Sequence, residues 1–229
     1  MSETTINLLL FPNLTQLDLT GPYEVLARVP DAKIELVGPT LDPVKSDRGL
    51  AILPTTTREH APACDLLVVP GGPGTDDAIL DPQWIAFVRE QAKTARWIFG
   101  ICTGSLLLGA AGLLRGRRSG GHWLARDLLT QFGAIVVDDR MVVDGNIYTS
   151  GGVTAGIDMA LRVVAEIAGE ETAKRIQLQI EYDPEPPFRS GTPFTASAET
   201  VEAQRKAGAA RRKIREEAVA KAAAALNNH

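Results

Sequence analysis

The sequence predicts an α/β protein with a mostly parallel, doubly wound sheet at the centre of a three-layer sandwich. Three observations lead to this prediction. Short apolar runs alternate with stretches of helical character along most of the chain. Several of these runs end in glycine-rich segments, as strands do in this fold class. The chain has 229 residues, of which 45% are hydrophobic, so it can bury a sizeable core.

Apolar runs without polar interruption are typical of strands buried on both faces, whereas strict alternation is typical of a half-exposed strand. Residues 33–37 alternate, and most of the other expected strands are continuous runs. The Asp144-Gly145 dipeptide favours the tight turn of a hairpin. The expected strands span residues 6–11, 33–37, 66–69, 97–99, 135–137, 141–143 and 147–149.

Segments with helical spacing or with helix-starting residues separate these strands. The first helix is expected after a loop that runs through Asp18, with Thr20 as its N-cap. The expected helices span residues 23–27, 82–94, 123–132, 151–167 and 170–180.

The last 35 residues differ from the rest because they are rich in alanine and in charges of both signs. We expect an α/β domain over residues 1–194 and a helical C-terminal extension over residues 195–229. The extension either packs on the domain or on a second subunit, or is a solvated helical tail. Its expected contact residues recur at helical spacing: Ala203, Ala207, Ala210, Ile214 and Ala218.

Charge and composition exclude several classes of function. A net charge of −4 gives no reason to expect nucleic acid or acidic lipid as a partner. No segment approaches the roughly 20 apolar residues that span a bilayer, and the acidic N-terminus lacks the basic start of a signal peptide. The two cysteines, Cys64 and Cys102, belong to no CxxC or Cys/His cluster, so we expect neither disulfides nor a metal site. These features fit a cytoplasmic protein that binds no membrane.

Cys102 lies where an apolar run ends and small residues begin, in Ile101-Cys102-Thr103-Gly104. This layout is typical of a nucleophile elbow, a tight strand-to-helix turn that holds a reactive side chain above the sheet. The partial positive charge of the following helix N-terminus favours thiolate over thiol. We therefore expect Cys102 to carry covalent or thiol-assisted chemistry, and Cys64 to be a core residue.

Two further loops follow strands of the predicted sheet. One carries Asp18, and the other is the glycine-rich segment 70–74. Because parallel strands end at the same edge of a sheet, we expect these loops to meet Cys102 there. The N–H groups of Gly72 and Thr103 are then expected to form a pocket that stabilises an anion.

Five segments, taken in order, resemble the motifs of the ThiJ/PfpI superfamily, which has a class-I-glutamine-amidotransferase-like fold. The resemblance runs from about residue 6 to residue 188. Within the superfamily the chain is most similar to the isocyanide hydratases, through Asp18, the Cys-Thr-Gly sequence and residues 177–188. The five segments are Asp18-Leu19-Thr20-Gly21-Pro22, Val69-Pro70-Gly71-Gly72-Pro73-Gly74, Ile101-Cys102-Thr103-Gly104, Gly121-His122-Trp123 and Gly151-Gly152-Val153-Thr154-Ala155-Gly156-Ile157-Asp158.

This resemblance implies an enzyme that hydrates a small apolar isocyanide to an N-substituted formamide, without a cofactor. It implies Cys102 as nucleophile, Asp18 as acid and base, and Thr103 as a further catalytic residue. It also implies a homodimer whose active sites lie near the subunit interface. The residues expected to bind the substrate or an oxyanion are Gly71, Gly72, Thr103 and Val153.

Histidine is scarce, which argues against a Cys–His pair. In several relatives a histidine follows the nucleophile directly, whereas here that residue is Thr103. His60 has no motif around it, and His122 either approaches the site or caps the helix expected at 123–132. Asp18 thus becomes the best acid/base candidate, with a turn or helix-capping role as its alternative.

Other functions stay open at this point. Relatives in the same superfamily act as glyoxalase-like or deglycase-like enzymes, and similar domains form the sensory half of helix-turn-helix regulators. Only about 35 residues follow Phe194, too few for a pair of such DNA-binding motifs. A non-enzymatic, cysteine-based redox sensor is a further alternative. Tyr182 and Phe188 either line an apolar pocket or are packing residues.

Overall fold

The computed structural model describes residues 3–227 and has a central seven-stranded sheet in the order β10-β11-β7-β6-β1-β2-β5. Each neighbouring pair is parallel except β10 with β11. The predicted mostly parallel α/β sheet is therefore confirmed. Its strands are β1 (Thr4–Leu9), β2 (Ala32–Gly38), β5 (Thr56–Thr57), β6 (Leu66–Val69), β7 (Trp97–Ile101), β10 (Met141–Asp144) and β11 (Ile147–Ser150).

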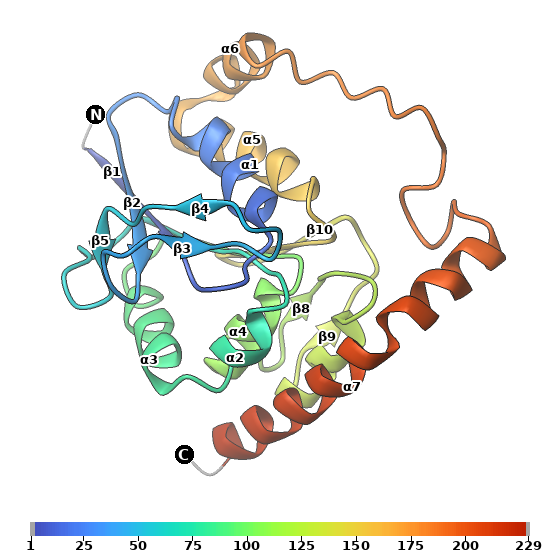
Figure 1. Ribbon diagram of the computed structural model, residues 1–229. Helices are drawn as coiled ribbons and strands as arrows, with labels where there is room; N and C mark the ends of the chain where they lie inside the picture. Colours follow the sequence, from blue (N-terminus) through green and yellow to red (C-terminus); the bar gives the residue numbers. More distant parts are fainter. Residues whose placement is uncertain (1–2, 228–229) are drawn as a thin grey trace.

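Helices cover both faces of this sheet (Figure 1). On one face, α1 packs on α5, and α6 packs on α5 in turn. On the other face α4 packs on β6 and β7 and is itself contacted by α2, α3, α7 and η1. The helices are α1 (Gln16–Leu26), α2 (Thr75–Ala78), α3 (Pro82–Gln91), α4 (Gly104–Ala110), α5 (Ala155–Ala168), α6 (Glu170–Gln179), α7 (Ala198–Asn227) and the 3-10 helix η1 (Arg126–Phe132).

Two small two-stranded sheets complete the structure. The antiparallel pair β3 (Val44–Lys45) and β4 (Ala51–Ile52) follows β2, and the parallel pair β8 (Arg118–Ser119) and β9 (Ile135–Val136) flanks η1. The strand expected at residues 135–137 is thus present, but it pairs outside the central sheet.

The continuous apolar runs form the strands at the centre of the sheet. Every residue of β6 and β7 is buried. The hairpin of β10 and β11 is also confirmed, and Gly145 adopts the positive φ of 61° that its turn requires. The carboxyl ends of β1, β6 and β7, which are neighbours in the sheet, consequently lie at one edge.

The first helix differs from its prediction. It begins at Gln16 with Thr15 as N-cap, so Asp18 lies in its first turn and Thr20 lies inside it. The Thr20 hydroxyl donates to Gln16 Oε1 at 2.8 Å instead of capping the helix. Pro22 lies inside this helix, where proline is normally unfavourable. Packing of α1 on α5 stabilises the helical conformation nevertheless, because residues such as Leu19 are buried there.

The C-terminal extension is one long helix, α7, which packs on α2, α4 and η1. An irregular segment links it to α6 and runs away from the body of the molecule (Figure 1). Of the residues predicted at helical spacing, Ala203, Ala207, Ala210 and Ile214 are exposed in the single chain and do not pack on the domain, whereas Ala218 does. Contact of the exposed residues with a second subunit stays a prediction. The stripe that packs on the domain lies nearer the C-terminus and consists of Arg215, Ala218, Val219, Ala222 and Ala223.

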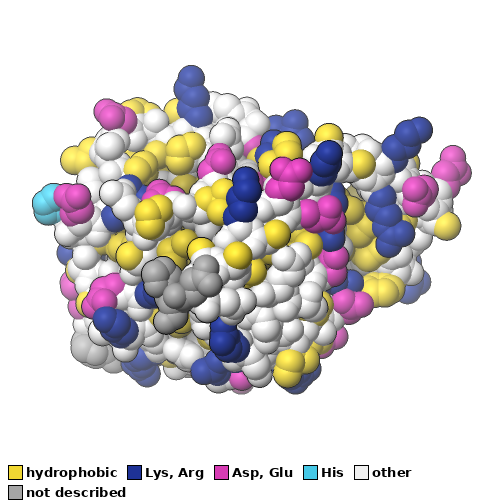
Figure 2. Space-filling model, turned by 90° about the horizontal axis from the view of Figure 1, so that it is seen from below, with side chains coloured by type: hydrophobic (Ala, Val, Ile, Leu, Met, Phe, Trp, Pro, Cys, Tyr) yellow, Lys and Arg dark blue, Asp and Glu magenta, His cyan; other side chains and the backbone are white. Residues whose placement is uncertain are grey.

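The surface carries charges of both signs. On the face seen in Figure 2, Lys and Arg side chains are interspersed with Asp and Glu and separated by apolar groups. The described residues on this face therefore do not form the continuous positive surface that is typical of nucleic-acid binding. Over residues 3–227, none of the helices has both the length and the hydropathy to span a membrane.

Gly104, the first residue of α4, sets how closely this helix approaches β6. A Cβ atom there would lie 2.1 Å from the Val69 carbonyl oxygen and 2.7 Å from that of Pro70. We expect Gly104→Ala to lower the free energy of unfolding by about 1–3 kcal/mol, since backbone must move to admit the methyl group. Urea titration measures this effect. Gly191→Ala is the matched control, because a Cβ there meets open space; equal stability of the two variants would contradict this account.

Candidate active site

Cys102 occupies a sharp turn between β7 and α4. Its φ of 58° is unusual for a residue with a side chain and stores backbone strain. Four hydrogen bonds hold it there: its N–H donates to the Ser150 and Gly151 carbonyls, and its carbonyl accepts from the His122 N–H and the Ser105 hydroxyl, each at 3.1 Å. Cys102 thus lies in a tight strand-to-helix turn, and hydrogen bonds from β11, the following loop and the His122 segment hold this turn in place. That the turn presents a nucleophile stays a prediction.

The Asp18 carboxyl is fully buried in the first turn of α1. Its Oδ2 accepts the N–H of Gly71 at 3.0 Å, while Oδ1 has no hydrogen-bond partner among the described residues. Burial raises the pKa of Asp18 to about 7, although the Gly71 N–H and the Cys102 thiol act in the opposite direction. Asp18 can therefore carry or release a proton near neutral pH.

The pKa of Cys102 is raised well above its ordinary value, because the thiol is buried and lies close to the negative charge of Asp18. The Thr103 N–H and the charge of Arg215 lower it, but by less. Burial and Asp18 therefore favour the thiol in the resting protein, in opposition to the helix N-terminus, which favours the thiolate. Desolvation outweighs the field of α4, a helix of only seven residues.

Thr103 ties the turn to the glycine-rich loop. Its hydroxyl accepts from the Gly72 N–H at 2.8 Å, donates to the Gly72 carbonyl at 3.2 Å, and lies 3.0 Å from the hydroxyl of Thr75. The Gly72 N–H is thus bonded to Thr103, and the Gly71 N–H is bonded to Asp18. The anion-stabilising pocket expected from Gly72 and Thr103 stays a prediction. In the structure the N–H of Thr103 acts on the Cys102 thiol.

Glycine at position 72 is a geometric necessity. Its φ is 125°, and a Cβ atom there would lie 2.3 Å from the backbone nitrogen of Thr15. The loop can therefore pass between the start of α1 and the Cys102 turn only without a side chain. Gly71 and Gly72 thus serve the site by bringing together Asp18 and Thr103.

His122 caps the turn that leads into η1. Its Nδ1 accepts the N–H of Leu124 at 3.3 Å. Burial, together with the positive charges of Arg215 and Arg126, lowers the pKa of His122 to about 4. This imidazole is therefore neutral near pH 7, and it contributes its backbone N–H, not a charge, to the Cys102 turn.

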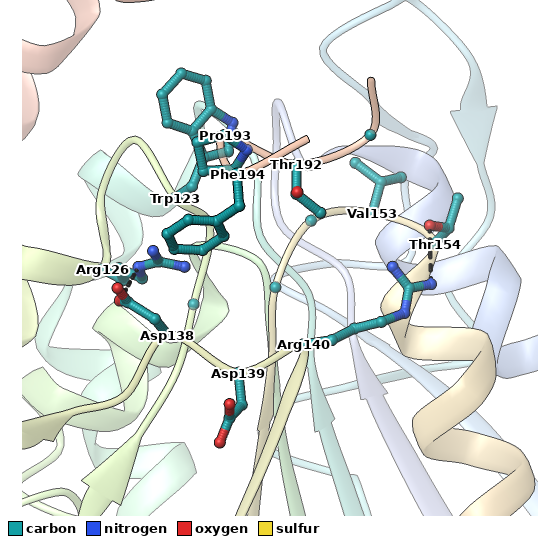
Figure 3. Close-up of a pocket in the computed structure, with 14 residues that line it drawn as sticks. Trp123, Arg126, Asp138, Asp139, Arg140, Val153, Thr154, Thr192, Pro193 and Phe194 are labelled. Atoms are coloured by element: carbon teal, nitrogen blue, oxygen red, sulfur yellow. Dashed lines mark hydrogen bonds and ion pairs between the residues drawn. The ribbon is translucent and has the colours of Figure 1, made fainter. Parts of the chain in front are cut away.

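A cavity of about 280 Å³ opens beside the Cys102 turn, and Val153 lines it (Figure 3). Trp123 and Phe194 give it an apolar end, while Arg126 pairs with Asp138 and Arg140 donates to Thr154. Cys102 is not itself among the lining residues, but Gly151, whose carbonyl it binds, and Gly121 are. The cavity therefore ends at the backbone that holds the thiol.

Tyr182 and Phe188 do not belong to this cavity lining. The Tyr182 hydroxyl donates to Asp158 Oδ1 at 2.6 Å, and Asp158 Oδ2 also accepts from Arg140. Phe188 is 78% exposed. Tyr182 thus fastens the segment after α6 to α5, and Phe188 packs on little of the described structure.

The sequence profile of the DJ-1/PfpI family matches residues 4–166, which include Asp18, the glycine-rich loop and Cys102. This chain belongs to the DJ-1/PfpI family. It is 52% identical to an isonitrile hydratase of Pseudomonas putida over 222 residues, which is 97% of either chain. It is 29% identical to the glutathione-independent glyoxalase DJR-1.2 of Caenorhabditis elegans over 58% of this chain and 73% of that protein.

Among solved structures, a ThiJ/PfpI family protein from Pseudomonas syringae superposes with a TM-score of 0.93 at 42% identity. The superposition covers 96% of this chain and 91% of that one, so it includes α7. The superfamily resemblance and the fold class predicted from the sequence are both confirmed.

Two charged residues beside the glycine-rich loop could not be predicted from the sequence. Arg215 of α7 and Asp76 of α2 are buried and form an ion pair at 2.6 Å, next to the Gly72 carbonyl. The only sequence signal is that Arg215 shares a helical stripe with Ala218 and Ala222, a pattern easily taken for a solvated face. Among residues 3–227, no three His, Cys, Asp or Glu side chains gather where they could hold a metal ion.

The raised pKa of Asp18 makes a prediction about stability. The folded protein binds this proton more tightly than the unfolded chain, so its contribution to stability is present below about pH 4 and is lost as pH rises to about 7. We expect Asp18→Asn to raise the free energy of unfolding at pH 8 by about 2–4 kcal/mol, since the amide keeps the Gly71 bond without a buried charge. Urea titrations at pH 5 and pH 8 measure it, and a difference that does not grow with pH would contradict the prediction.

Proposed function

We propose that this protein hydrates isocyanides, also called isonitriles, to N-substituted formamides. The observation that carries the proposal is the 52% identity to an isonitrile hydratase over nearly the whole length of both chains. The buried pair of Asp18 and Cys102 supports it, because the reaction needs a group that delivers a proton to carbon and a group that attacks the same carbon.

In the first step Asp18 accepts the thiol proton of Cys102 and passes it to the terminal carbon of R–N≡C. The sulfur attacks this carbon, a C–S bond forms, and a thioimidate, R–N=CH–S–Cys, results. A carboxyl with a pKa near 7 suits both halves of the transfer, since it accepts and releases a proton at similar cost. The Thr103 N–H stabilises negative charge on the sulfur as the proton leaves.

In the second step Asp18, now ionised, takes a proton from water, and the hydroxide adds to the thioimidate carbon. Asp18 passes the proton that it took from water to the nitrogen. The C–S bond then breaks, the added hydroxyl becomes the carbonyl of R–NH–CHO, and its proton passes through Asp18 to the departing thiolate, so the cycle consumes one isocyanide and one water. The Oδ1 atom of Asp18, which lacks a partner in the described structure, is the oxygen we assign to the water.

The cavity lined by Val153, Trp123 and Phe194 is the proposed place of the substituent R. Its aromatic end suits an apolar group, while the isocyanide carbon points towards the Cys102 turn. In this assignment Gly71 and Gly72 act by holding Asp18 and Thr103 and do not contact the substrate.

Conversion of 2-oxoaldehydes is the second candidate function, favoured by the similarity to the glyoxalase DJR-1.2. A redox sensor is less well supported, because a buried thiol of raised pKa has little thiolate to react with oxidants. An assay of the purified protein with an aryl isocyanide and with methylglyoxal separates the two enzymes. Formamide formation with no lactate supports hydration, and lactate alone contradicts it.

We also propose a cytoplasmic homodimer, as expected from the sequence, with an α/β domain over residues 1–194 and a helical extension over 195–229. Cys64 and Cys102 are free thiols, which suits a reducing compartment. Exposed Phe188 and Phe194 side chains, 78% and 71% accessible in the single chain, are groups that a second subunit can cover. Light scattering on a sizing column measures the mass.

Cys102→Ala and Asp18→Asn should each lower formamide production at least 1000-fold, because one removes the attacking atom and the other the proton carrier. Product detection by mass spectrometry, with circular dichroism to check folding, measures the loss. Cys64→Ala is the matched control, because that thiol is buried with a pKa of about 12 and should not be needed. Formamide production that persists in the Cys102→Ala protein would remove the nucleophile from the mechanism.

A further inference from the structure

Arg215 is a buried arginine that α7 brings to the active site from the far end of the chain. Only 8% of its surface is exposed. Its Nε donates to Asp76 Oδ1 at 2.6 Å, and its Nη2 donates to the Gly72 carbonyl at 3.4 Å. Asp76 is itself buried, and its other carboxyl oxygen lies 3.3 Å from Arg211. An ion pair this deep is costly to form, so its placement beside the glycine-rich loop calls for an explanation.

The contacts of Gly72 connect Arg215 with the proposed catalytic groups. The carbonyl that accepts from Arg215 also accepts from the hydroxyl of Thr103. The N–H of the preceding residue, Gly71, is the group that holds Asp18. Arg215 thus holds the carbonyl of Gly72, and the N–H of the neighbouring Gly71 holds the carboxyl of Asp18.

Arg215 also acts through its charge. It lowers the pKa of Cys102, in opposition to burial and to Asp18. It contributes with Arg126 to keeping His122 neutral, so that the imidazole adds no positive charge of its own. The charged and titratable groups around the thiol and its neighbours are Asp18 and Asp47 towards α1, His122 and Arg126 near η1, Asp76 in α2, and Arg211 and Arg215 in α7.

We propose that Arg215 is a positioning residue of the active site: it holds the Gly71-Gly72 loop against Asp18 and balances negative charge that forms on Cys102. This inference rests on the proposed roles of those two residues. Its consequence is that α7, which lies outside the segment matched by the family profile, is part of the catalytic unit.

The test compares Arg215→Met and Arg215→Lys with Arg212→Met as the matched control. Arg212 lies on the same helix and forms a two-pronged ion pair with Asp127, with bonds of 2.7 and 2.6 Å, but it does not touch the loop. Two readouts are used: kcat and KM with an aryl isocyanide, and the pH profile of iodoacetamide alkylation at Cys102. Peptide mass spectrometry distinguishes Cys102 from Cys64.

We expect Arg215→Met to lower kcat by about 10- to 100-fold with KM changed less than threefold, and to move the alkylation profile of Cys102 to higher pH. Arg215→Lys keeps the positive charge but cannot bond Asp76 and the Gly72 carbonyl through two separate nitrogens. It should therefore have the alkylation profile of the parent protein, whereas its kcat should stay several-fold below the parent value. Arg212→Met should stay within twofold of the parent protein in both readouts.

A folded Arg215→Met protein with the parent kcat and alkylation profile would overturn the inference. So would an Arg212→Met protein that loses as much activity, since the effect would then reflect docking of α7 alone. If Arg215→Met does not fold, Arg215→Lys decides, and parental kcat in that variant overturns the inference. The alkylation profile is measured without turnover, so it tests the role of Arg215 even if the parent protein hydrates no isocyanide. Absence of hydration would contradict the proposed function but not the inference about Arg215.

Discussion

The bond from the Gly71 N–H to the buried carboxyl of Asp18 is the interaction on which the rest of the site depends. A carboxyl without exposure to water resists ionisation, and here a single backbone donor and a neighbouring thiol only partly offset that cost. The resulting pKa near 7 destabilises the fold at neutral pH. A protein keeps such a group when chemistry requires it, because the same desolvation that weakens the fold makes the carboxyl able to exchange a proton.

The fold brings Asp18 and Cys102 together at the carboxyl ends of three neighbouring strands. Strands β1, β6 and β7 are neighbours, and the chain leaves them through the start of α1, the glycine-rich loop and the Cys102 turn. Close approach of these three segments requires glycine at positions 72 and 104, where a methyl group would collide with backbone atoms. The strained φ of Cys102 is held in turn by hydrogen bonds from β11 and from the His122 loop. Backbone contacts and hydrogen bonds therefore fix the arrangement of Asp18, the glycine-rich loop and Cys102.

The C-terminal helix α7 also contributes a hydrogen bond that holds the glycine-rich loop in place. Through Asp76 and Gly72, Arg215 connects a segment at the end of the chain with a loop in its first third. Burial and the charge of Asp18 raise the pKa of Cys102, so the resting group is a thiol. In the proposed mechanism this proton leaves through Asp18 when sulfur attacks, and the two side chains then act as a coupled pair.

The sequence by itself determined six of the seven strands of the central sheet, the hairpin, the turn at Cys102 and the meeting of Asp18 with the glycine-rich loop, but not the two-residue strand β5. These features follow from local rules, namely apolar runs, the turn preference of Asp-Gly and the common edge of parallel strands. Only the tertiary structure decided that α1 begins before Asp18, that the Gly72 N–H is bonded to Thr103, and that the thiol is protonated at rest. The same holds for the burial of Arg215, which depends on its ion pair with Asp76, a residue 139 positions earlier in the chain. Burial and long-range pairing set these features, and neither quantity can be read from a residue and its neighbours in sequence.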